Sequence, residues 1–224
     1  MNMNKTIIIA NWKMNPGSAA EAQELFETVA KGIEGIDGAE IVICPPFVYL
    51  SMLRGLDLKF QIGAQDCFWE EQGAFTGEVS ANMLKDLGCS HVILGHSERK
   101  KYFGETEEMT QKKMKAALAA GLKVVLCIDD KEKTPRDEPN LFVVYEPEWA
   151  ISSEGGEPAD PKIVAAKIAD MRATLQTTPI LYGGSVDSSN IAMFLKETKV
   201  QGALVGSASL DADEFIALVK NAQM

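Results

Sequence analysis

The sequence predicts an α/β fold in which residues 1–224 form a single (β/α)₈ barrel, and two observations lead to this prediction. First, eight short runs of apolar, largely β-branched residues recur along the chain, and helical patterns separate most of them. Second, most runs are apolar throughout, as expected for parallel strands that are buried on both faces. No linker, repeat or low-complexity segment divides the series, which favours one barrel over the alternative, a doubly wound sheet.

The expected elements follow one another along the chain. Strands are predicted at 6–10, 40–44, 60–64, 91–95, 124–128, 142–146, 180–183 and 203–206. Helices are predicted at 18–33, 105–120, 161–175, 187–196 and 211–220. The first of these helices repeats Ala22, Phe26 and Val29 at helical spacing behind Ser18, a typical N-cap, and Pro161 suits the first turn of the third. Segment 46–54 has room only for a short helix.

One predicted unit lacks its helix. The chain has 224 residues, whereas a barrel of this kind usually needs about 250. Segment 129–140, DDKEKTPRDEPN, has two prolines and no apolar residue, so it cannot form an amphipathic helix that packs on a barrel. We therefore expect a loop between the fifth and sixth strands. The outer faces of these two strands must then be covered by neighbouring helices, by the loop or by another subunit.

Composition excludes several classes of protein. Hydrophobic residues make up 46% and charged residues 24% of the chain, the balance of an ordinary globular protein. The net charge of -10 argues against nucleic acid as a partner and requires a local cationic site for any anionic substrate. Neither a signal peptide nor an apolar run of about 18 residues is present, so we expect no membrane partner. The four cysteines form no CxxC pair, which favours buried, reduced thiols in a cytoplasmic protein.

Candidate catalytic side chains follow the carboxyl ends of the strands, where barrels carry their chemistry. Asn11 and Lys13 follow the first strand, His96 the fourth and Glu146 the sixth. Each has an ordinary alternative interpretation, since a lysine there is usually solvated and a glutamate often caps a helix. The other histidine, His91, begins a strand and is expected to be structural.

Two turns of small residues occupy the same rim. Gly183, Gly184 and Ser185 follow the seventh strand, and Gly206 and Ser207 follow the eighth. Such turns are often plain connections, but before a helix they present backbone N–H groups and the helix dipole to an anion. Their occurrence together with the polar side chains, on five strand ends, favours an active site.

Six segments make the chain resemble the triosephosphate isomerase family. They are ANWKMN at 10–15, GAFTGE at 73–78, VILGHSER at 92–99, YEP at 145–147 followed by WAI at 149–151, YGGSV at 182–186 and LVG at 204–206. They occur in the family's order. The resemblance implies a TIM barrel that interconverts dihydroxyacetone phosphate and D-glyceraldehyde 3-phosphate in glycolysis and gluconeogenesis. The sequence has no metal-ligand spacing or dinucleotide-binding fingerprint, so we expect no cofactor or metal.

The resemblance also implies roles for individual residues. Glu146 would be the base, His96, Lys13 and Asn11 would stabilise the enediolate, and Glu98 would hold Lys13. Backbone N–H groups of Ser152, Ser185, Gly206 and Ser207 would bind phosphate. Segment 147–158, with Pro147 and Trp149, would close as a lid, and Ile151 and Leu204 would form an apolar clamp on the base. A homodimer is implied, in which loop 65–78 carries Thr76 to the partner's site.

The chain departs from the family pattern in three places. Ser152 replaces a usual glycine in a lid that lacks the family's Gly-Thr-Gly-Lys core, and Ser207 replaces a second glycine. The third departure is the helix-free segment 129–140. Two other functions remain as alternatives: a phosphate-binding barrel isomerase of amino-acid biosynthesis, and a binding protein without catalysis on the same scaffold.

Overall fold

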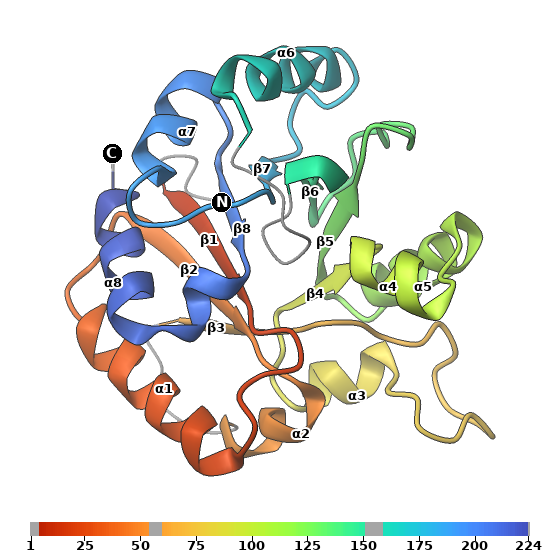
Figure 1. The fold of residues 1–224 in the computed structure, drawn as a ribbon. Helices are drawn as coiled ribbons and strands as arrows, with labels where there is room; N and C mark the ends of the chain where they lie inside the picture. The colour runs from red at the N-terminus through yellow and green to blue at the C-terminus, as the bar shows by residue number, and fades with distance from the viewer. Residues whose placement is uncertain (1–4, 54–59, 151–158, 224) are drawn as a thin grey trace.

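Eight parallel strands close into a barrel in the computed structural model, which describes residues 5–53, 60–150 and 159–223 (Figure 1). Neighbours in the chain are neighbours in the sheet, and β8 pairs back with β1. The strands are β1 (Thr6–Asn11), β2 (Ala39–Cys44), β3 (Gln61–Ala64), β4 (His91–Leu94), β5 (Lys123–Ile128), β6 (Leu141–Tyr145), β7 (Ile180–Tyr182) and β8 (Gly202–Val205). All eight predicted strands are therefore confirmed, each within one residue at either end.

Helices surround the barrel (Figure 1). They are α1 (Ala19–Gly32), α2 (Phe47–Leu50), α3 (Ala81–Asp86), α4 (Ser97–Phe103), α5 (Glu107–Ala119), α6 (Pro161–Arg172), α7 (Ile191–Thr198) and α8 (Ala212–Asn221), with 3₁₀ turns η1 (Ser51–Leu53), η2 (Glu148–Ala150) and η4 (Ser207–Leu210). The predicted cap of α1 is present, since the Ser18 hydroxyl accepts the N–H of Glu21. Pro161 is in the first turn of α6, as predicted, and Asp160 caps this helix.

Alternate residues of each strand enter two separate apolar layers. Ile7 and Ile9 of β1 belong to a cluster that draws only on strand residues, which is the interior of the barrel. Ile8 packs in the larger cluster that also contains Phe26 and Val29 of α1, which is the layer between barrel and helices. Because both faces of the strands are buried, the runs lack the polar alternation of a half-exposed sheet.

The crossover from β5 to β6 contains no helix, as predicted, and its residues 129–140 are all described. Its side chains fasten it to the barrel wall. Asp130 accepts a hydrogen bond from the Tyr145 hydroxyl (2.9 Å), and the Asp137 carboxylate accepts the backbone N–H groups of residues 176–178. The outer-face residues Val143 and Tyr145 are at most 1% exposed, so one chain covers these strands without a second subunit.

Two helices were not predicted, and one begins later than predicted. Helix α3 has only six residues, and α4 buries no side chain, so neither has a long apolar stripe to recognise. Helix α7 begins at Ile191 rather than at 187, because the Asp187 carboxylate accepts the N–H groups of Ser189 and Asn190 and forms a turn there.

Candidate active site

Glu146 and His96 form the centre of the site. Glu146 directly follows β6, and His96 lies two residues beyond the end of β4 as the N-cap of α4. The Oε1 atom of Glu146 is 3.1 Å from Nε2 of His96, and the N–H of Ser97 donates to Oε2 at 3.1 Å. Both side chains are buried, at 4% and 5% exposure. A carboxylate and an imidazole thus face each other where little water reaches them.

Hydrogen bonding assigns the proton of His96. The N–H of Glu98 donates to Nδ1 (3.2 Å), so Nδ1 carries no proton and the ring proton sits on Nε2, toward Glu146. Burial alone would lower the pKa of His96, but the carboxylates of Glu146 and Glu98 raise it. Burial would raise the pKa of Glu146, but His96 and the N–H of Ser97 hold it below its ordinary value, so the base is ionised.

Lys13 is held in an uncommon backbone conformation beside this pair. Its φ angle is +54°, in the left-handed region, where a residue other than glycine costs about 1–3 kcal/mol. Asn11, the last residue of β1, accepts the Lys13 N–H through Oδ1 (3.0 Å), and the Gln65 amide donates to the Lys13 carbonyl (2.8 Å). These two contacts offset the strain and direct the side chain.

The ammonium of Lys13 lies between two groups. Its Nζ is 2.6 Å from Oε1 of Glu98, the partner that was expected for it. A Cβ atom added to Gly206 would lie 3.4 Å from Cε of Lys13, so the side chain passes directly over the turn after β8. One pocket is lined by Asn11, Lys13, His96, Glu146, Gly183, Gly184, Leu204 and Gly206. The local positive charge that an acidic protein needs for an anion is therefore in this pocket.

The turns after β7 and β8 approach the pocket as bare backbone. A Cβ on Gly184 would lie 2.1 Å from the Tyr182 hydroxyl oxygen, and one on Gly183 would lie 2.6 Å from Cγ1 of Val144, so glycine is required at both positions. Ser207 begins η4, a turn whose first N–H groups have no partner within the helix. The N–H and hydroxyl of Ser185 both donate to the Ala150 carbonyl at 2.9 Å. The Ser185 N–H must therefore leave Ala150 before it can bind a ligand.

The expected lid lies largely outside the described residues. Ile151 and Ser152 are among those that the structure does not describe. Pro147 is buried at the start of the segment, and the Trp149 side chain is 49% exposed. Leu204 of β8 is 3% exposed, lines the pocket and belongs to the inner apolar cluster.

Thr76 lies away from this pocket, on an exposed loop. Residues 71–78 are all exposed, and the loop projects beyond α3 (Figure 1). At its base, Phe68 packs against Trp69 and Phe75, with ring centroids 4.1 Å and 4.7 Å apart. The structure gives Thr76 no part in the pocket of its own chain.

Other features of the described residues concern metals and membranes. Within 5–53, 60–150 and 159–223, no group of three or more His, Cys, Asp or Glu is placed to hold a metal ion. No helix in the described part of the chain has the length and apolar character needed to cross a membrane. All four cysteines are buried, free thiols.

Two functional contacts were not foreseen from the sequence. The first is the hydrogen bond from the N–H of Ser97 to the carboxylate of Glu146. Ser97 lies in the same motif as His96 and Glu98, but the motif does not indicate that its backbone contacts Glu146. Gln65 holds the backbone of Lys13 from the end of β3, 52 residues away in the chain, and no pattern in the sequence indicates this contact.

Comparison with known proteins places this geometry in context. The triosephosphate isomerase family model matches residues 6–222. Relatives named triosephosphate isomerase include those of Dehalococcoides mccartyi strain BAV1, 40% identical over 252 residues (98% of this chain, 97% of the relative), and Geobacter metallireducens, 41% over 249 residues (97% and 98%). The protein of Aquifex aeolicus is 38% identical over 249 residues (96% and 98%). These alignments are longer than the chain itself, so the relatives have segments that this chain lacks.

Proposed function

The chain belongs to the triosephosphate isomerase family and has its isomerase activity, and we propose that the pocket at the carboxyl ends of the strands performs the reaction. The reaction interconverts dihydroxyacetone phosphate and D-glyceraldehyde 3-phosphate and belongs to glycolysis. Family membership decides against a barrel isomerase of amino-acid biosynthesis, because the match extends over almost the whole chain and not only over the phosphate-binding turns.

Glu146 is the base of the proposed mechanism. The reaction moves a proton between two adjacent carbons, so one group must remove a carbon-bound proton and return it to the neighbouring carbon. The Glu146 carboxylate is ionised, buried and carried by the end of β6, next to a rigid strand. Substrate that enters the pocket separates it from His96, which takes away a partner that lowers its pKa and makes it more basic.

His96, Lys13 and Asn11 stabilise the negative oxygen that develops as the proton leaves. The Nε2–H of His96 already points into the pocket, because Nδ1 is occupied by the N–H of Glu98. A neutral imidazole donates this hydrogen bond without needing an ionised state. The Lys13 ammonium supplies the positive charge, and Glu98 fixes its position.

The phosphate is bound by backbone at the other side of the pocket. Gly206 lies against the Lys13 side chain, and Ser207 follows it at the start of η4. Their backbone N–H groups and the Lys13 ammonium would together give the dianion hydrogen bonds and a cation. Ser185 joins them after it releases the Ala150 carbonyl, and Ser152 contributes from the lid. Closure of 147–158, with Pro147 and Trp149 at its start and Ile151 against Leu204, excludes water from the enediolate.

The observation that carries this proposal is the 3.1 Å contact between Glu146 and His96 in the same pocket as Lys13. The test is Glu146→Asp, which withdraws the carboxylate by about one bond length. A misplacement of about 1 Å costs roughly 10²-fold in rate, so kcat should fall by about that factor while KM changes little. Conversion is followed by NMR with a metal chelator present, and Glu138→Asp on the exposed crossover is the matched control. Unchanged turnover in Glu146→Asp would refute the assignment.

We further propose a homodimer and a cytoplasmic location for this single-domain chain. The exposed loop 71–78 and the exposed side chain of Phe75 support the dimer, because the loop has a bulky apolar residue that its own chain covers only in part. Thr76 would then reach the partner's pocket near Asn11 and His96. Four free thiols and no disulfide among the described residues support a reducing compartment.

A further inference from the structure

The helix α4 supplies several contacts that shape the catalytic pocket. His96 is its N-cap, and the N–H of Ser97 at its first position donates to Glu146. The N–H of Glu98 donates to His96, and the Glu98 carboxylate binds Lys13. A small rotation of this one helix would therefore change the hydrogen bonding of the base, the imidazole and the ammonium together.

This helix is not held by apolar packing. None of its seven side chains is buried, and its two aromatic residues, Tyr102 and Phe103, are 65% and 70% exposed. Most helices in proteins owe their stability to an apolar face packed on the core. The position of α4 must depend instead on its polar contacts.

Ionic contacts fasten α4 on two sides. Arg99 binds Asp66 at the end of β3 (2.9 Å) and Glu105 before α5 (2.7 Å). Lys100 binds Glu132 of the helix-free crossover. Arg99 and Lys100 thus connect α4 to different parts of the barrel wall.

Glu132 is itself anchored. The oxygen that receives Lys100, Oε2, also accepts the backbone N–H of Asp129 at 3.1 Å, directly after β5. The side chains of Glu132 and Lys100 are 20% and 25% exposed, so water screens this pair less than a fully solvated one. The pair therefore connects α4 to the end of β5 through one carboxylate.

We propose that Glu132, acting through Lys100, is a positioning residue for Glu146 and His96. It holds α4 in the place where the Ser97 N–H and the His96 ring contact the Glu146 carboxylate. The inference rests on the proposed role of Glu146 as base. In this chain the helix-free crossover, which is one of its departures from the family pattern, thus contributes to the active site as well as covering the barrel.

The variant Glu132→Gln separates a positional effect from a simple change in charge. Loss of a negative charge favours ionised carboxylates nearby, which would lower the pKa of Glu146. A displaced α4 weakens the Ser97 hydrogen bond, which would raise it. His96, Lys13 and Cys127 are the described titratable groups that adjoin Glu146 and could also shift its titration, and the variant changes none of them.

The experiment measures kcat, KM and the pH profile of kcat/KM for Glu132→Gln and Lys100→Met. We expect kcat to fall about tenfold and KM to change by less than about twofold. A misplacement of about 1 Å costs roughly 10²-fold in rate, and the displacement of α4 in these variants should be smaller. In Glu132→Gln, the acid limb of the kcat/KM profile should move to higher pH by about half a pH unit. The double variant should be no worse than either single variant, and Lys100→Arg should recover most of the turnover.

Controls separate this proposal from other causes. Glu138→Gln removes the same charge from the same crossover and should behave like the parent protein. Sedimentation velocity at assay concentration checks that assembly is unchanged. An acid limb of Glu132→Gln that is unmoved or moves to lower pH, or a parental kcat in both single variants, would overturn the positioning role. If Glu146→Asp lost no turnover, the proposed function itself would fail, which is a different result.

Discussion

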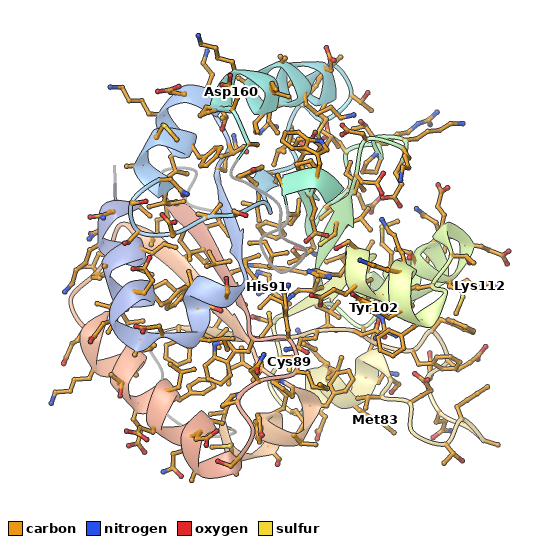
Figure 2. All side chains as sticks on the ribbon, viewed as in Figure 1. Met83, Cys89, His91, Tyr102, Lys112 and Asp160 are labelled. Atoms are coloured by element: carbon orange, nitrogen blue, oxygen red, sulfur yellow. The ribbon has the colours of Figure 1, made fainter. Side chains whose placement is uncertain are left out.

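The buried histidine at the start of β4 should make the protein less stable in mild acid, between pH 6.5 and pH 3. His91, labelled in Figure 2, is 0% exposed, and its Nδ1 is 2.8 Å from the Ser90 hydroxyl. Its Nε2 has no hydrogen-bond partner within the described structure. Burial and the nearby ammonium of Lys123 outweigh Glu40 and lower the pKa of His91 from 6.5 to about 3.

The sign and size of the effect follow from proton linkage. Below pH 6.5 the unfolded chain binds a proton at residue 91 that the folded chain refuses, so the free energy of unfolding falls as the pH falls. At pH 5 the loss relative to pH 8 is about 2 kcal/mol. The loss of about 2 kcal/mol depends on the pKa of His91 in the unfolded chain, because pH 5 lies well above its pKa of about 3 in the folded protein. With only two histidines in the chain, few other side chains titrate between pH 5 and 6.5.

The assay is urea unfolding, followed by circular dichroism at fixed protein concentration from pH 5 to pH 8. The comparison is with His91→Gln, which removes the titrating group and should flatten the dependence by about 2 kcal/mol over this range. His96 acts in the opposite direction, since its pKa is raised and its stabilisation is lost as the pH rises, but it is common to both proteins. Parallel curves for the parent and His91→Gln would refute the reasoning.

Two further predictions concern the glycine turn and the loop. Gly184→Ala places a methyl group 2.1 Å from the Tyr182 hydroxyl oxygen, so the turn after β7 must move. We expect KM for glyceraldehyde 3-phosphate to rise at least about tenfold. Gly17→Ala, at an exposed position with room for the methyl group, is the control, and thermal melting checks that both variants fold. Thr76→Arg on the exposed loop should lower activity and yield a monomer in sedimentation experiments; a monodisperse monomer with full activity would contradict the dimer proposal.

Much of the barrel was predictable from the sequence because its determinants are local. The strands are buried on both faces, so Ile7, Ile8 and Ile9 read as a continuous apolar run. The helix-free crossover was predictable for the opposite reason, since a segment with no apolar residue has no face to pack. Helix α4 was not predicted, because it forms without burying a side chain and its sequence SERKKYF therefore shows no apolar stripe.

The residues of the pocket were predictable, but their connections were not. Strand ends and motifs brought Asn11, His96 and Glu146 to one rim. The positive φ angle of Lys13 depends on Gln65, which tertiary folding brings to it from β3. The capture of the Ser185 N–H by Ala150 depends on the path of the chain before the lid, which no local pattern specifies.

The crossover between β5 and β6 is also a suitable site for inserting a foreign peptide or domain into this barrel. Its two ends are fixed independently, by Glu132 toward α4 and by Asp137 toward residues 176–178. The four residues between them, 133–136, form neither helix nor strand. Because closing a longer loop costs only slightly more entropy, a guest peptide or domain grafted there would leave both anchors, and hence the pocket residues on α4, in place. The shortened chain thus offers on its outer wall an attachment point for cargo at a place where a full-length barrel would have a packed helix.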